Sequence, residues 1–112
     1  MTLELHTLLL IFTAHFIGDF VLQSDTMAIG KSTSNYRLTQ HLVVYTAFIA
    51  VATLSPVWAL VNGIAHWITD YFTSRWTSRA WKAGHRHDFF VIIGLDQLIH
   101  AATLMATAVW LW

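Results

Sequence analysis

The segment from residue 3 to residue 23, LELHTLLLIFTAHFIGDFVLQ, is a nearly unbroken apolar run that decides how the chain folds. As a helix, its 21 residues rise about 31 Å, which matches the hydrocarbon thickness of a bilayer. The run lacks the basic start and the small-x-small cleavage pattern of a signal peptide, and it carries His15 and Asp19. We therefore predict a retained transmembrane helix.

The composition of the whole chain also favours lipid surroundings. Of its 112 residues, 56% are hydrophobic and only 11% are charged, and the mean hydropathy is +0.56. A soluble domain usually has about 25% charged residues, and a small domain needs more polar surface rather than less. The net charge of zero gives no electrostatic reason to expect a nucleic-acid partner. The absence of Cys excludes thiol catalysis and thiolate metal sites.

Three more apolar runs follow, at residues 38–54, 57–73 and 89–111. Together with residues 3–23 they predict an all-α fold, a four-helix transmembrane bundle of up-down-up-down topology, as one domain over residues 1–112. Ser55 and Pro56 are typical of a helix N-cap and a first helical position, so the second and third helices should form a tight hairpin. Asp88 is the predicted N-cap of the fourth helix.

The charge distribution predicts the orientation in the membrane. The polar segments 24–37 and 74–88 would lie on the same side, and they contain all six basic residues: Lys31, Arg37, Arg75, Arg79, Lys82 and Arg86. By the positive-inside rule, these segments are cytoplasmic and both termini lie on the non-cytoplasmic side. Arg75, Arg79 and Lys82 recur at helical spacing, so the third helix can continue past residue 73 as a basic turn at the membrane surface.

A polar stripe runs through the apolar helices. Each of the three Asp residues in the predicted spans has a His four residues away, which places both side chains on one helix face. The pairs are His15 with Asp19, His66 with Asp70, and His100 with Asp96. The order is reversed in the last helix, which runs in the opposite direction, so every Asp lies nearer the cytoplasm than its His. His41 lies at a similar depth, so four helices direct polar groups into one layer.

Carboxylates in this layer need a compensating positive charge, because an ionisable group in hydrocarbon costs several kcal/mol unless it is paired. No Lys or Arg lies inside a predicted span, which leaves protons on His or a bound metal ion. Imidazole and carboxylate donors without thiolate suit Zn best, and also Fe or Mn. The predicted ligands are His15, Asp19, His41, His66, Asp70, Asp96 and His100. The amides predicted to orient these ligands are Gln23, Asn62 and Gln97.

These motifs resemble those of a family of small integral membrane proteins from bacteria and phages that has no assigned activity. The similarity rests on HFIGDFVLQ at residues 15–23, Lys31, His41, NGIAHWITDY at residues 62–71 and DQLIH at residues 96–100. The resemblance implies a multi-pass protein of the bacterial inner membrane. A looser similarity, in chemistry rather than in alignment, is to membrane-bound metal-dependent hydrolases that place His and Asp on several helices.

We therefore expect an intramembrane metal site near the cytoplasmic face, in a metal-dependent hydrolase that acts on a lipid or lipid-linked substrate. The metal would activate water, and one of Asp19, Asp70 and Asp96 would take its proton. One alternative is a metal-ion or proton transporter, because ionisable residues in membrane helices often mark ion paths. Another is a non-enzymatic structural or partner-binding membrane protein, in which the His–Asp pairs only join helices. The sequence leaves the oligomeric state open, a homo-oligomer included.

Overall fold

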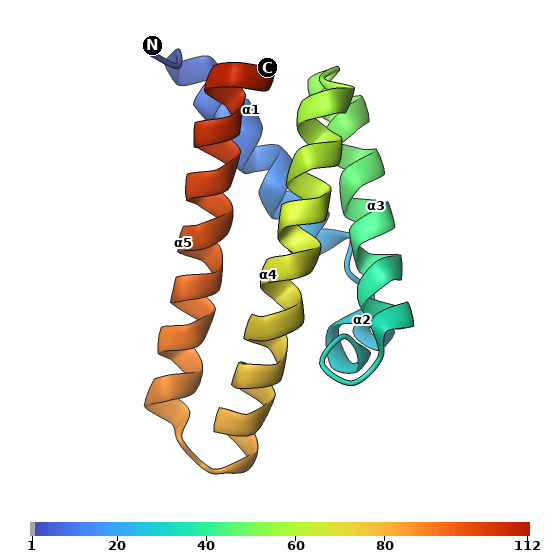
Figure 1. Ribbon diagram of the computed structural model, residues 1–112, viewed down its shortest axis with the longest axis vertical. Coiled ribbons are helices and arrows are strands. Elements are labelled where there is room, and N and C mark those ends of the chain that lie inside the picture. The colour runs from blue at the N-terminus through green and yellow to red at the C-terminus, as the bar shows by residue number, and fades with distance from the viewer. Residues whose placement is uncertain (1) are drawn as a thin grey trace.

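All regular elements in the part of the chain that the structure describes, residues 2–112, are helices. The computed structural model contains, in chain order, α1 (Leu5–Phe16), the π-helix η1 (Ile17–Val21), α2 (Asp25–Gly30), α3 (Asn35–Thr53), α4 (Pro56–Lys82) and α5 (Arg86–Leu111), as Figure 1 shows. The predicted all-α class is confirmed. The predicted domain also includes Met1, which lies outside the described residues.

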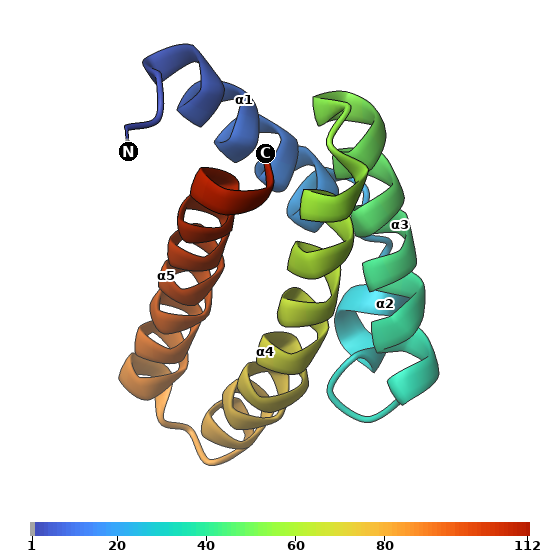
Figure 2. The ribbon, with the colours of Figure 1, turned by 45° about the horizontal axis from the view of Figure 1, so that its top comes forward.

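The helices are arranged around a long antiparallel hairpin of α4 and α5. α3 packs along α4, and α1 packs against α3 and against the C-terminal part of α5 (Figure 2). The start of α1, the C-terminus and the turn between α3 and α4 lie toward one end of the molecule, and the turn between α4 and α5 lies at the opposite end (Figure 1). The molecule measures 43 × 26 × 20 Å, so it is elongated along the hairpin.

The helix boundaries follow local sequence signals, with one correction. Ser55 is the N-cap of α4 and Pro56 its first residue, although the Ser55 side chain makes no capping hydrogen bond. α4 continues to Lys82, as the spacing of its basic residues allowed. The prediction that Asp88 caps α5 was wrong, because the chain turns at Gly84, with a φ of 77°, and enters α5 at once. Asp88 therefore lies in the first turn, where a carboxylate stabilises the positive end of the helix dipole.

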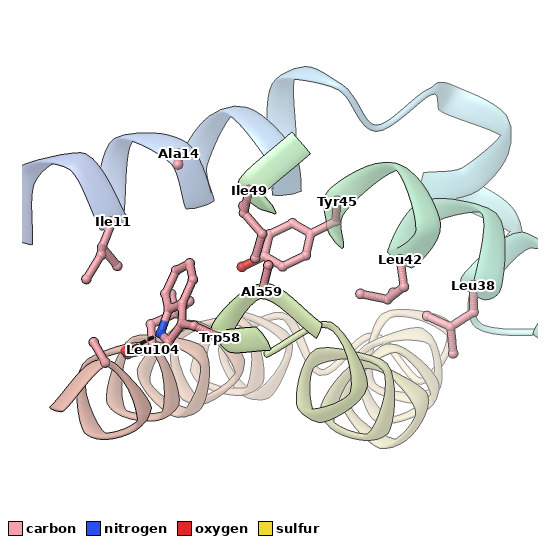
Figure 3. Close-up of a cluster of buried hydrophobic side chains, with 10 residues drawn as sticks. Ile11, Ala14, Leu38, Leu42, Tyr45, Ile49, Trp58, Ala59 and Leu104 are labelled. Carbon is pink, nitrogen blue, oxygen red and sulfur yellow. Dashed lines mark hydrogen bonds between the residues drawn. The ribbon is translucent and has the colours of Figure 1, made fainter. Parts of the chain in front are cut away.

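An apolar cluster fills the end of the bundle that holds the chain termini. Ile11 of α1, Ile49 of α3, Trp58 of α4 and Leu104 of α5 are fully or almost fully buried there. The indole nitrogen of Trp58 donates a hydrogen bond of 3.2 Å to the Leu104 carbonyl, which fixes α4 to α5 (Figure 3). Burying side chains of this size supplies roughly 1.5–3 kcal/mol each, so the cluster is a main source of packing free energy.

Outside this cluster the usual distribution of polarity is reversed. Large apolar side chains face outward on every long helix, among them Val51 at 76% exposure and Leu98 at 65%. Inside the bundle, in contrast, His41, His66 and Asp70 are at most 2% exposed. Soluble proteins bury apolar side chains and rarely bury charged ones, so this interior needs a specific explanation.

Judged from length and composition, α5 is the one described helix that is long and apolar enough to cross a membrane. The apolar segment Leu5–Val21 is shorter. The prediction of four such helices is therefore not supported on this criterion. The physical reason lies in the polar side chains, since Asn62, His66 and Asp70 lower the mean hydropathy of α4.

Candidate metal centre

Four helical segments bring polar side chains together about midway along the bundle. His15 comes from the end of α1 and Asp19 from η1. The π-helical turn brings Asp19 inward, and such turns occur often at functional sites. Gly18 makes this possible, because a Cβ atom there would lie only 2.9 Å from the Tyr45 ring of α3. The absence of a side chain at residue 18 thus lets η1 approach α3.

The first group of donor atoms consists of two carboxylates and two imidazoles, from Asp19, His41, His66 and Asp70. Asp19 Oδ1 lies 3.0 Å from His41 Nε2 and 3.2 Å from His66 Nε2. Asp70 Oδ2 lies 3.2 Å from His66 Nε2 and 3.6 Å from His41 Nε2. A tetrahedral Zn with ligands at about 2.0–2.2 Å separates its ligand atoms by about 3.3–3.6 Å. The four atoms are therefore spaced nearly as a metal would need them.

A second group of donor atoms shares Asp70 with the first. His100 Nε2 lies 3.1 Å from Asp70 Oδ1 and 3.2 Å from Asp96 Oδ1. The two oxygens of Asp70 thus face different groups, with Oδ1 toward His100 and Oδ2 toward His66. A carboxylate in this position can bridge two metal ions, so the arrangement can hold one ion or a pair.

Hydrogen bonding alone does not account for the pair of His66 and Asp70. His66 Nε2 is 3.2 Å from Asp70 Oδ2, but neither atom makes a hydrogen bond, and both are buried. The other ring nitrogen of His66 is also without a partner. Leaving buried polar atoms unsatisfied is costly, so a ligand between them would remove a penalty of about 1–3 kcal/mol for each atom.

Hydrogen bonds from neighbouring residues orient the donors. The side-chain carbonyl oxygen of Gln97 accepts a hydrogen bond of 3.0 Å from His15 Nε2. The amide nitrogen of Gln97 donates to Asp19 at 3.3 Å and to Asp96 at 3.1 Å. The Thr73 hydroxyl donates to Asp96 Oδ1 at 2.6 Å. Such partners fix the direction of a ligand and raise its affinity for the metal.

The sequence of the chain matches a known protein family. The family model described as "Protein of unknown function (DUF3307)" matches residues 6–112. The chain belongs to this family. No curated protein and no solved structure matches it. The DUF3307 description names no activity, so the function has to be argued from the geometry of the centre.

Of the predicted site residues of this DUF3307 protein, the ligand His15 and the three amides Gln23, Asn62 and Gln97 lie outside both donor groups. His15 Nε2 is 3.6 Å from Asp19 Oδ2, and its Nδ1 lies 2.7 Å from the Tyr45 hydroxyl. Asn62 instead donates to the Trp58 carbonyl and to Thr107, which joins α4 to α5 one turn away from His66. Gln23 accepts a hydrogen bond of 3.3 Å from Lys31. Gln97 is the predicted amide that contacts the donor carboxylates directly.

Sequence reasoning missed several polar side chains at the DUF3307 centre. Tyr45 follows His41 by four residues, and Thr73 and Ser74 follow Asp70 by three and four, so helical spacing could have indicated them. Lys31 has no such helical spacing to a predicted ligand. Its ammonium group lies 3.6 Å from Asp70 Oδ2, which corrects the inference that protons and metal ions were the only cations within reach.

The centre is open on one side. A cavity of about 260 Å³ is bordered by Asp19, Asp70, Asp96, Gln97 and Lys31. On the opposite side lies the apolar cluster, with Ile49, Trp58 and Leu104 fully or almost fully buried (Figure 3). Small molecules can therefore reach the carboxylates from the end at which α4 and α5 are connected.

Proposed function

We propose that this protein is a metal-dependent hydrolase of the bacterial inner membrane, which acts on a lipid or lipid-linked substrate at the cytoplasmic face. One observation carries the proposal: the buried pair of His66 Nε2 and Asp70 Oδ2, 3.2 Å apart, has no hydrogen-bond partner and points into a ring of further donors. If these polar residues only joined α4 to its neighbours, their buried atoms would be hydrogen bonded to other helices. The donor set of imidazole and carboxylate fits Zn best, with Fe and Mn as the alternatives.

The membrane location is supported by the reversed polarity of the bundle. Side chains such as Val51 and Leu98 face outward, and the most polar residues face inward. Mean hydropathy treats every side chain as if it met lipid, but Asn62, His66 and Asp70 do not. We therefore keep four membrane crossings as our proposal, with the six basic residues on the cytoplasmic side.

Different residues of the chain would have different roles in hydrolysis. A bound divalent ion lowers the pKa of a coordinated water to near neutrality and polarises the substrate. Asp19 and Asp70 are the deeply buried carboxylates and would hold the ion. Asp96 is more accessible, with 15% of its side chain exposed, and it borders the cavity. With one ion bound at the first donor group, Asp96 is therefore best placed to accept a proton from the attacking water, while Thr73 and Gln97 orient it; with a second ion bound, Asp96 would hold that ion.

The geometry favours this function over transport. An ion path would need polar groups on both sides of the centre. One turn beyond His66, the buried Asn62 side chain is hydrogen bonded to Trp58 and Thr107, and the interior past it is filled by Ile49, Trp58 and Leu104, which are fully or almost fully buried. A site that is open on one side and closed on the other fits a reaction at one membrane face.

Elemental analysis of the detergent-purified protein tests the metal site. The parent should contain about one or more equivalents of Zn, Fe or Mn per chain, and His66→Ala should contain much less. His87→Ala is the matched control, because His87 is an exposed histidine in the first turn of α5 and should not affect the metal content. A parent protein without metal would support the purely structural alternative.

Incubation of the purified protein with a lipid extract tests the reaction. We expect a cleavage product that appears with added Zn or Mn, disappears with a chelator and is absent for His66→Ala. Metal binding without any metal-dependent product would contradict the hydrolase while leaving the metal site in place.

A further inference from the structure

We infer that the substrate is a phosphate monoester carried by an apolar chain, and that Lys31, Ser74 and Lys82 recognise its phosphate group. The inference rests on the proposed function and specifies its substrate class. It starts from Lys31, whose ammonium group lies 3.6 Å from Asp70 Oδ2 at the edge of the metal centre. A lysine in this position faces both the carboxylates and whatever enters the cavity.

The cavity at the centre continues into a second one of about 450 Å³. The two cavities share Lys31, Ser74, Thr77 and Phe89 in their walls, so they form one trough that leads away from Asp96. Lys82 borders the outer part of the trough. Both lysines of the chain therefore line this trough, and none of its four arginines does. A trough with two ammonium groups is suited to an anion.

Ser74 provides an independent sign of a ligand. Its hydroxyl oxygen is buried, has no hydrogen-bond partner and belongs to a residue that borders both cavities. The residue is only 7% exposed. A buried hydroxyl without a partner is costly, and a phosphate oxygen in the trough would accept its hydrogen bond. Thr77 borders the same space, but its hydroxyl already donates to the Ser74 carbonyl at 3.0 Å, so Ser74 has the free donor.

When both donor groups hold a divalent ion, charge balance favours a dianion. Two divalent ions and the Lys31 ammonium would carry five positive charges, against three carboxylates from Asp19, Asp70 and Asp96. The excess of two positive charges would be unfavourable in a low-dielectric interior and matches a phosphate monoester, which carries up to two negative charges. A carboxylic ester or an amide carries none. Two-metal centres are also well suited to phosphoryl transfer, because they stabilise both the attacking and the leaving oxygen.

Several large apolar side chains of the trough are open to the outside. Phe20 and Trp81 are each 49% exposed, and Ile29 is 79% exposed. An apolar chain attached to the phosphate would lie against these side chains and continue into the bilayer. In the reaction, the water oxygen bonds to phosphorus and the ester P–O bond breaks. A water proton passes to the departing alcohol, and inorganic phosphate is the second product.

Binding measurements on the full chain in detergent test this assignment without relying on turnover. The probes are dodecyl phosphate, dodecanoate and inorganic phosphate, titrated into the metal-loaded protein by calorimetry. We expect dodecyl phosphate to bind more tightly than either of the others. Lys31→Gln and Ser74→Ala should each weaken its binding about tenfold, and Lys82→Gln should weaken it about twofold to threefold.

Arg79→Gln is the matched control for Lys82→Gln, because it removes one positive charge from the same end of α4 at a residue outside the trough. Its dodecyl phosphate affinity should equal that of the parent. Equal affinities for dodecyl phosphate and dodecanoate would overturn the assignment, as would equal losses in the Arg79 and Lys82 variants. Tighter binding of inorganic phosphate than of dodecyl phosphate would contradict the inference that the trough recognises an apolar chain. Tight dodecyl phosphate binding without hydrolysis would instead leave the trough in place and contradict the proposed reaction.

Discussion

The imidazole rings of His66 and His100 stack on each other between α4 and α5, with centroids 3.8 Å apart and an interplanar angle of 24°. Their Nε2 atoms lie 3.2 and 3.1 Å from the two different oxygens of Asp70. One carboxylate therefore serves both rings, and both groups of donor atoms depend on it. This arrangement predicts that substitutions of the two carboxylates on α4 and α5 have unequal effects.

Asp70→Asn should abolish binding of both metal ions, whereas Asp96→Asn should abolish binding of one. The amide keeps the size of the side chain but removes the negative charge that each ion needs. The measurement is the number of metal ions per chain in the purified variants, determined by elemental analysis.

Asp88→Asn provides the control for this comparison. Its carboxylate is also on α5, but 66% of the side chain is exposed and it lies near His85 rather than at the centre. Its metal content should equal that of the parent. If Asp70→Asn keeps the full metal content, Asp70 does not bridge two ions.

Thr73→Val should weaken binding at the second donor group about 10–100-fold. The Thr73 hydroxyl donates to Asp96 Oδ1 at 2.6 Å, and valine keeps the shape while removing the donor. Competition with a chelator of known affinity measures the effect. Thr69→Val is the control, since the Thr69 hydroxyl bonds only to the Ala65 carbonyl of its own helix. Equal affinities in the two variants would show that the bond to Asp96 does not tune the metal.

Much of the centre could be predicted because α-helices repeat in a regular way. The spacing of four residues that pairs His66 with Asp70 fixes both on one face, whatever the rest of the fold does. In the last helix, which runs in the opposite direction, the order of Asp96 and His100 is reversed. The same helical spacing therefore predicted that these two residues lie at the depth of the other Asp and His residues. These residues do meet in the structure, within a few ångströms of each other.

The remaining features depend on contacts that no short-range pattern encodes. Lys31 reaches Asp70 only because α2 packs against α3 and ends beside the centre. The π-helical turn at Asp19 depends on how closely η1 approaches Tyr45. The mean hydropathy of a helix averages over the polar side chains that the bundle turns inward, so a count of crossings from hydropathy alone depends on contacts that the averaging leaves out. Propensity and periodicity describe one helix at a time, and these features arise between helices.

Gly63→Ala should lower the stability of the protein by about 1–3 kcal/mol. α3 and α4 approach closely at this residue, and an added methyl group would overlap the Thr46 side chain. Pushing these helices apart would also separate His41 from His66, so metal content should fall together with the melting temperature. Thermal unfolding in detergent measures the first effect, and elemental analysis measures the second.

Two further variants make this prediction specific. Gly94→Ala changes a glycine on α5 whose added methyl group would meet nothing within 4 Å, so it should be neutral or stabilise the helix by about 0.5–1 kcal/mol. Thr46→Ala should partly restore the stability of Gly63→Ala by removing the overlapping atoms. Equal melting temperatures for the two glycine variants would contradict close packing of α3 on α4.

Single cysteines should report opposite sides of the membrane when placed at the two ends of the bundle. The chain has no native Cys, so each introduced thiol is read without background. Leu54 is 86% exposed at the turn between α3 and α4, and His87 is exposed near the turn between α4 and α5. In intact bacterial cells, an impermeant maleimide should label Leu54→Cys at once and His87→Cys only after the membrane is opened, because the basic end faces the cytoplasm. Labelling of both variants in intact cells would contradict the crossing, and labelling of His87→Cys alone would reverse the orientation and move the centre to the outer face.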